Sequence, residues 1–229
     1  MKRSEINQIM RESLAFLREM KVKLPPFGYW SPQDWREKGP EAREIVEQQL
    51  GWDITDFGSG DFGRVGLLLF TARNGTLAEL ANPLGKIYGE KLLIVQEGQI
   101  TPQHFHFQKM EDIINRAGGN LVIQLWNSTP EEGLADTDVT VSCDGVRVTV
   151  PAGGTITLTP GDSVCLPQRL YHKFWGENGI TLVGEVSRVN DDRTDNRFYE
   201  KVGRFPAIEE DVEPLHLLTM DYAAFYRFC

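Results

Sequence analysis

The sequence predicts a mainly β protein with a helical segment at its N-terminal end, and two observations carry this prediction. Residues 1–52 place apolar side chains at helical spacing behind helix-start signals. Residues 63–190 instead form short β-rich runs separated by Gly, Pro, Asn and Asp. Many short strands at close spacing favour a β-sandwich or barrel over alternating βαβ units. We therefore expect a helical layer packed on one β-barrel.

Three helical signals precede the barrel. Apolar residues lie on one helical stripe over residues 4–20, and Ser4 is the predicted N-cap. Ser31 followed by Pro32 predicts the start of a second helix, because serine caps helices and proline suits their first position. A third helix is predicted over 41–50.

The β-rich part contains six runs that we expect to form strands. Asn74-Gly75 is a hairpin signal, and Asp144-Gly145 and Pro160-Gly161 mark further turns. "GSGDFG" at 58–63 fits a dinucleotide-binding pattern, but a β-like run follows it where that motif needs a helix, so we expect a loop. The six runs are RVGLLLFTARNG, EKLLIVQEGQ, NLVIQLWNS, VTVSCDGVRVTV, TITLTPGDSVCLP and ITLVGEVSRV.

The composition indicates an ordinary globular protein. Of the 229 residues, 41% are hydrophobic and 25% are charged, and the formal net charge is −9. This negative charge disfavours a nucleic-acid partner. No apolar run approaches the ~20 residues that span a bilayer, so we expect no membrane partner. The three cysteines are odd in number and widely spaced, which argues against a disulfide framework and favours the cytoplasm.

The chemistry is concentrated in "TPQHFHFQKMEDIINRAGG", residues 101–119. His104 and His106 are two apart, so on a strand both face one side and can reach one metal ion. Glu111 has the opposite parity and joins them only if a bend or bulge resets the phase, which would also turn Lys109 inward. His172 begins a later strand. Three imidazoles and a carboxylate would leave two of six octahedral positions open on a divalent metal.

The spacing of these residues matches two known motifs. The first cupin motif is matched by Gly98, His104, His106, Glu111 and Gly118. Five residues separate Gly98 from His104, four separate His106 from Glu111, and six separate Glu111 from Gly118. The second cupin motif is matched by Gly161, Pro167 and His172; Arg169 and Gly176 stand where glycine and asparagine are usual. The resemblance implies a cupin fold, a double-stranded β-helix or jelly-roll barrel.

Longer stretches resemble the D-lyxose isomerase family of cupin sugar isomerases. They include HFHFQKMEDIINRAGGNLVIQLWNS, GEVSRVNDDRTDNRF, GRFPAIEEDVEPLHLL and the opening KRSEIN, so the resemblance covers nearly the whole chain. It implies a homodimer that interconverts D-lyxose with D-xylulose, and often D-mannose with D-fructose. One divalent ion per subunit is implied, Mn²⁺ first and Zn²⁺, Co²⁺ or Fe²⁺ as alternatives. The resemblance implies, by motif match, that the ligands of this ion are His104, His106, Glu111 and His172.

Isomerisation assigns roles to further residues. A metal that holds two adjacent sugar oxygens stabilises the charge that forms when a carbon-bound proton leaves. Lys109 is expected to assist proton transfer at the oxygens, unless it is a solvated strand lysine. The resemblance favours Glu209 or Glu210, in the acidic run IEEDVEP, as the base. Glu185 and Asp192 are predicted to bind sugar hydroxyls, or only to brace strands and turns.

The predicted organisation is one cupin domain over 1–229. It has a helical layer over 1–52, a barrel core over 63–190 and an extension over 191–229 that completes the site. Proton transfer through a cis-enediol is favoured over a hydride shift. Two alternatives stay open: an Fe(II)-dependent cupin oxygenase, whose ligands would be similar, and a cupin that binds sugar without catalysis.

Overall fold

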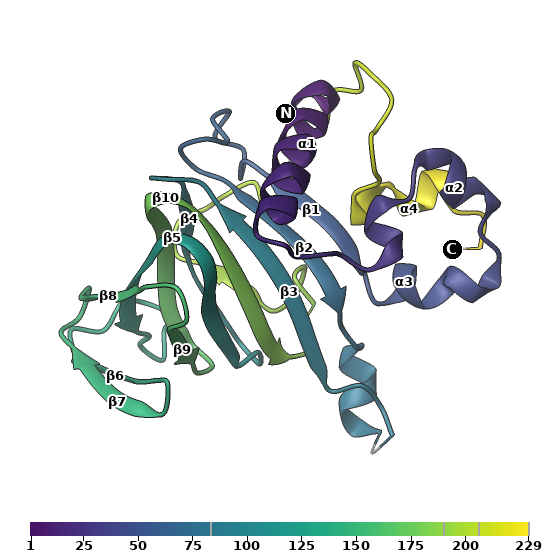
Figure 1. Ribbon diagram of the computed structural model, residues 1–229. Helices are drawn as coiled ribbons and strands as arrows, with labels where there is room; N and C mark the ends of the chain where they lie inside the picture. The colour runs from purple at the N-terminus through teal and green to yellow at the C-terminus, as the bar shows by residue number, and fades with distance from the viewer. Residues whose placement is uncertain (83, 190, 206, 229) are drawn as a thin grey trace.

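The computed structural model describes residues 1–82, 84–189, 191–205 and 207–228. Most helices come first along the chain, one antiparallel sheet follows them, and a short helix comes after the last strand (Figure 1). The predicted mainly β protein with a helical N-terminal segment is confirmed. The helices are α1 Arg3–Glu19, α2 Pro32–Glu37, α3 Arg43–Glu47 and α4 Tyr222–Phe225, with short 3-10 helices at Pro26–Tyr29, Pro40–Ala42, Leu77–Ala81 and Thr219–Asp221. The strands are β1 Gly51–Thr55, β2 Leu67–Arg73, β3 Tyr88–Val95, β4 Ile100–His106, β5 Glu111–Asn127, β6 Val139–Cys143, β7 Val146–Val150, β8 Thr155–Leu158, β9 Ser163–Leu166, β10 Leu170–Arg188 and β11 Asn196–Phe198.

Two long strands close the sheet on itself. β10 pairs with β5 along most of its length, with β3 through its second half and with β4 through its first. β5 in turn pairs with β8 and β9. Because each long strand has different neighbours at its two ends, the sheet folds over into a barrel whose interior is shared by β2 to β5 and β10.

The alternation of side chains along β2 separates the two faces of the sheet. Leu67 and Leu69 belong to the cluster inside the barrel. Leu68 and Phe70 face the other way and pack with the apolar side of α1. Helix α1 therefore covers the outer face of the sheet, as Figure 1 shows, and leaves the inner face to the site.

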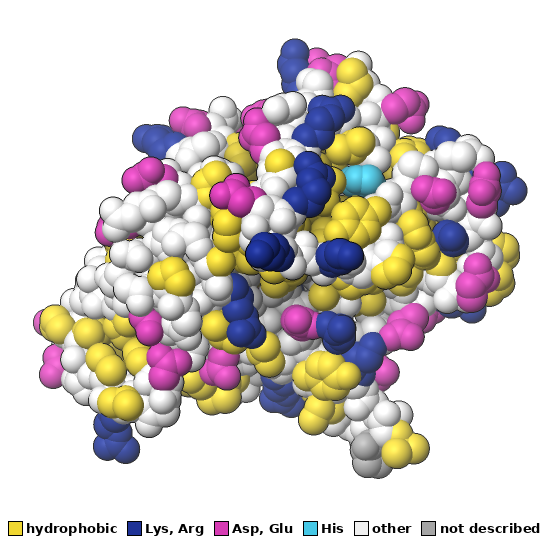
Figure 2. Space-filling view, viewed as in Figure 1, with side chains coloured by type: hydrophobic (Ala, Val, Ile, Leu, Met, Phe, Trp, Pro, Cys, Tyr) yellow, Lys and Arg dark blue, Asp and Glu magenta, His cyan; other side chains and the backbone are white. Residues whose placement is uncertain are grey.

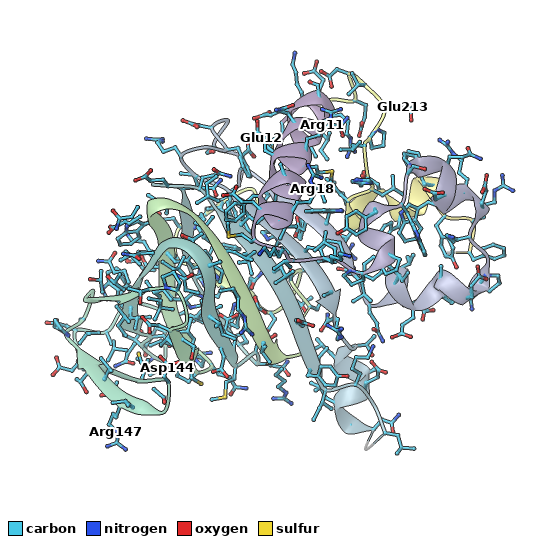
Figure 3. All side chains as sticks on the ribbon, in the orientation of Figure 1. Arg11, Glu12, Arg18, Asp144, Arg147 and Glu213 are labelled. Carbon is cyan, nitrogen blue, oxygen red and sulfur yellow. The ribbon has the colours of Figure 1, made fainter. Side chains whose placement is uncertain are left out.

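Helix α1 forms where the apolar spacing predicts a helix, with one difference at its start. Its solvent side carries Arg11, Glu12 and Arg18, which are exposed (Figure 3), and acidic and basic side chains are mixed over this face of the molecule (Figure 2). The predicted N-cap at Ser4 is wrong, because the helix begins at Arg3. The C-terminal segment holds this first turn, and the Ser4 hydroxyl donates to Asp211 at 2.6 Å. In the described part of the chain, no helix is long and apolar enough to cross a bilayer.

The second and third helical signals mark real helices. Ser31 caps α2 and accepts a hydrogen bond from the Asp34 amide. The third signal becomes a 3-10 turn followed by α3, which ends at Glu47, so the region is helical over a shorter span than predicted. The chain is already extended at Gly51, where β1 begins, a strand the sequence did not reveal.

The turn signals differ in how well they predict the connections. Asp144 and Gly145 join β6 to β7 as a two-residue hairpin, with φ of +50° and +83°. The hairpin predicted at Asn74-Gly75 is wrong, because a longer connection containing the 3-10 helix Leu77–Ala81 joins β2 to β3. The glycine-rich stretch at 58–63 is the predicted loop.

An ion cluster fastens α1 to the C-terminal segment. The Arg3 guanidinium is 1% exposed and lies 2.7 Å from the carboxylate of Glu210 and 2.8 Å from that of Asp221. Burial alone would lower the pKa of Arg3, but the two carboxylates raise it. A guanidinium so placed is costly to remove because it would leave Asp221, itself largely buried, without its cation.

We expect Arg3→Ala to lower the free energy of unfolding by about 2–3 kcal/mol. The matched control is Lys2→Ala, which removes an exposed pair with Glu209 and should cost less than about 1 kcal/mol. Denaturant unfolding of both variants measures the difference. Equal costs for the two changes would contradict a structural role for the buried cluster.

Candidate metal centre

Three histidines converge inside the barrel. His104 and His106 extend from β4 and His172 from β10, where it is the register partner of His104. One ring nitrogen from each lies within 4.8 Å of those of the other two, and all three side chains are buried. The two-residue period of β4 puts its pair on one face, and the pairing with β10 brings the third.

Hydrogen bonds fix the orientation of two of the rings. His104 Nδ1 lies 2.7 Å from the Pro102 carbonyl oxygen, and His172 Nδ1 lies 3.0 Å from that of Leu170. A ring that donates through Nδ1 to a carbonyl keeps the lone pair of Nε2 for a metal. Both rings therefore present a donor atom to the shared space.

The bend after β4 turns two more side chains inward. It is held by Asp195, whose carboxylate accepts from the amides of Gln108 at 2.8 Å and Lys109 at 3.0 Å. Beyond it, Glu111 opens β5 with its Oε1 3.4 Å from Nε2 of His106, and Lys109 Nζ lies 2.5 Å from Glu111 Oε2. The bend thus resets the phase of the strand, the condition under which Glu111 joins the histidines.

The protonation of this cluster suits a cation. Burial and the neighbouring histidines lower the pKa of His104 well below its usual value, and burial lowers that of His172 to about 4. Burial would raise the pKa of Glu111, but the charge of Lys109 holds it well below normal. Neutral imidazoles and an ionised carboxylate are the forms that bind metals.

His106 gives an independent sign of a missing partner. Among the described residues, neither of its buried ring nitrogens has a hydrogen-bond partner. Such unpaired buried groups are costly and rare in native structures. A metal ion bound by the three imidazoles would satisfy one of them, so the cluster fits a divalent metal site.

A row of alternating charges leads from this centre towards the barrel mouth. Lys109 Nζ lies 3.0 Å from Glu185 Oε1, Lys91 Nζ lies 3.8 Å from the same oxygen, and Lys91 Nζ lies 3.2 Å from Asp192. Burial alone would lower the pKa of Lys109, but Glu111 and Glu185 raise it above normal, so it stays a cation. Burial would raise the pKa of Asp192, and Lys91 instead lowers it.

Arg204 and Asp53 complete the row, and sequence reasoning missed both of them and Lys91. The Arg204 guanidinium lies 2.5 Å from Asp53 and 3.8 Å from Asp192. Lys91 shares strand parity with the core residues Leu93 and Val95, a signal that it faces inward. We find no comparable signal in the sequence for Arg204, which lies in an irregular segment.

The structure does not bring Glu209 or Glu210, the predicted bases, to the histidines. Glu209 pairs with Lys2, and Glu210 with Arg3, at the start of α1. Glu213, from the same acidic run, also lies beside this end of the helix in Figure 3. Helix α1 covers the outer face of the sheet and the histidines lie inside the barrel, so the run lies on the opposite side of the sheet from the histidines. His216, the fourth histidine of the chain, is half-buried, and its Nδ1 lies 3.0 Å from the Trp30 carbonyl oxygen.

Three glycines of the two cupin motifs adopt backbone conformations that favour glycine. Gly98, Gly118 and Gly161 have φ of +70°, +90° and +107°, a region that favours glycine. Arg169, which replaces a usual glycine, keeps the left-handed backbone with φ of +59°. Its guanidinium packs over the rings of Phe105 and Phe107 at 5.0 and 5.7 Å, which offsets part of the backbone strain.

Comparisons with known proteins give the family of the chain. Residues 1–222 match the D-lyxose isomerase family model. A D-lyxose/D-mannose isomerase of Serratia proteamaculans is 48% identical over 98% of this chain and 99% of its own length. One of Escherichia coli O157:H7 is 46% identical over 98% of this chain and 100% of its own.

Solved structures support the fold. The L-ribose isomerase of Cellulomonas parahominis bound to L-ribose aligns with 91% of this chain and 98% of its own, with a TM-score of 0.54 and 18% identity. That of Acinetobacter sp. DL28 in complex with L-ribose has the same coverage, a TM-score of 0.55 and 17% identity. The barrel is thus shared by proteins of very different sequence, and the cupin-type barrel expected from the motifs is confirmed.

Proposed function

The chain belongs to the D-lyxose isomerase family, and from that premise we propose that it interconverts D-lyxose with D-xylulose and D-mannose with D-fructose. The observation that carries the proposal is the buried cluster of His104, His106 and His172 with charged residues at its side. Glu111 is the fourth ligand in this proposal. A bound divalent ion supplies Lewis-acid stabilisation of negative charge on the two adjacent sugar oxygens.

Glu185 is the base in this proposal, in place of Glu209 and Glu210. Its carboxylate is buried, lines the same cavity as the histidines and is held by hydrogen bonds from Lys109 and from the Ser187 hydroxyl, each at 3.0 Å. A carboxylate fixed in this way can take the proton from C2 of the sugar and return it to C1, through a cis-enediol.

Lys109 is the donor in this proposal. Its ammonium lies between Glu111 and Glu185 and remains charged, so it can donate to the sugar oxygen on which negative charge develops. Asp192 lines the cavity beyond Glu185 and accepts hydrogen bonds from sugar hydroxyls. The near-complete burial of Lys109, Glu111 and Glu185 excludes water, which strengthens each electrostatic contact.

The whole chain acts as one domain in this proposal, with a helical layer over 1–52, a barrel over 63–190 and an extension over 191–229 that completes the site. Arg204 supports this, because it comes from the extension and lines the cavity of the histidines. Mn²⁺ as the native ion, a homodimer and a cytoplasmic location stay predictions. Metal analysis of protein purified without added metal and light scattering of the pure protein test the first two.

A sugar panel tests the activity. Manganese-loaded protein, without oxygen, is incubated with pentoses and hexoses, and ketose formation is measured. We expect D-xylulose from D-lyxose and D-fructose from D-mannose, and no product after chelation of the metal. Binding of these sugars without any ketose would favour the sugar-binding alternative. Oxygen consumption by iron-loaded protein would favour the oxygenase.

A further inference from the structure

A second cavity adjoins the metal cavity at the barrel mouth. It has a volume of about 250 Å³ and shares Leu69, Lys91 and Asp192 with the cavity of the histidines. Polar side chains, among them Thr71 and Asn74, line much of its remaining wall. We call it the outer cavity. Of its lining residues, only Asp192 has a role in the function proposed above.

The metal cavity is the narrower of the two. Its volume is about 40 Å³, against about 250 Å³ for the outer cavity, and both have Leu69, Lys91 and Asp192 in their walls. A sugar whose reacting carbons lie beside the histidines therefore finds more room for its remaining carbons past the boundary that Lys91 and Asp192 form.

The inner face of the sheet changes from apolar to polar between the metal cavity and the outer cavity. On β2, Leu67 and Leu69 face the metal cavity and Thr71, next in the same row, faces the outer cavity. On β3, Leu93 pairs with Leu69 and Lys91 pairs with Thr71. Both strands thus change from apolar to hydrogen-bonding side chains at the same level, where sugar hydroxyls would arrive.

The polar groups at the boundary are held in place. Lys91 Nζ lies 3.2 Å from Asp192, and Asp192 lies 3.8 Å from Arg204, which Asp53 holds at 2.5 Å. Asp53 lies on β1 and lines the outer cavity. Fixed donors and acceptors of this kind orient a flexible polyol at a low entropic cost.

We propose that the outer cavity binds the end of the sugar far from the metal, and that Thr71 sets the length of sugar that the site accepts. The inference rests on the proposed isomerase function. A pentose ends near Thr71, and the additional hydroxymethyl group of a hexose lies beyond it in the outer cavity. Thr71 is a specificity-determining residue that does not touch the reacting carbons.

Thr71→Leu tests the proposal by filling the cavity beside the sugar's far end. We expect kcat/KM for D-mannose to fall at least about 10-fold more than for D-lyxose, chiefly through KM, since one carbon unit in a fitted pocket is worth about this much. Thr71→Val is the matched control. It keeps the volume and loses the hydroxyl, and should leave the ratio of the two sugars within about 3-fold of the wild-type ratio.

The outcomes separate the two proposals. Wild-type protein that isomerises neither sugar refutes the function itself. Wild-type protein that isomerises both, with a ratio that Thr71→Leu leaves unchanged, refutes the subsite alone. If Thr71→Leu does not fold, Thr219→Leu fills the same cavity from a half-buried position on the C-terminal segment and should shift the ratio in the same direction. An unchanged ratio there overturns the subsite equally.

Discussion

His172→Ala should lose the metal and nearly all isomerase activity. The ring comes from β10, which pairs with β4 so that His172 lies opposite His104, and no other histidine in the described structure joins His104 and His106. Lewis-acid stabilisation is worth several kcal/mol, and each 1.4 kcal/mol is about tenfold in rate. We expect kcat to fall by about 1,000-fold or more.

Two measurements check this prediction. Elemental analysis gives the metal content after dialysis, and a sugar assay gives the turnover of the same samples. The matched control is His216→Ala, which removes the fourth histidine of the chain, bound to the Trp30 carbonyl and outside the cluster. It should retain both metal and activity. Full occupancy of His172→Ala by metal would refute the ligand set.

The residues around the histidines could be read from the sequence because their relation is local. His104 and His106 share a face by strand parity, and the motif glycines, Gly98 in a turn and Gly118 inside β5, have the positive φ that favours glycine. The parity of Glu111 also indicated that it could join the histidines only through a bend or bulge. What fixes that bend is Asp195, distant in sequence, whose carboxylate accepts from two backbone amides.

The position of the acidic run could not be predicted in this way. An acidic run such as 209–213 has no periodicity that indicates which side of a sheet it will lie on. Its position depends on the path of the C-terminal segment, which returns along α1, where Arg3 binds Glu210. Glu185, by contrast, shares strand parity with the core residue Val183, and this signal of an inward side chain was present in the sequence.

Glu185→Gln should keep the metal and lose most proton transfer. The amide has nearly the shape of the carboxylate and can still accept from Lys109 and Ser187, but it cannot take a proton from carbon. General-base catalysis typically contributes 10²–10⁴-fold, so we expect exchange of the C2 proton with solvent to slow by about that factor. Deuterium incorporation into the sugar, followed by NMR in D₂O, measures the exchange directly.

Glu210→Gln is the control for this experiment, because it also replaces a carboxylate by an amide, at the start of α1 rather than in the cavity. Its exchange rate per folded molecule should equal that of the wild-type protein. The two variants together decide between the two locations of the base. Slow exchange in Glu210→Gln with normal exchange in Glu185→Gln would place the base in the acidic run, and the C-terminal segment would then have to leave α1 during catalysis.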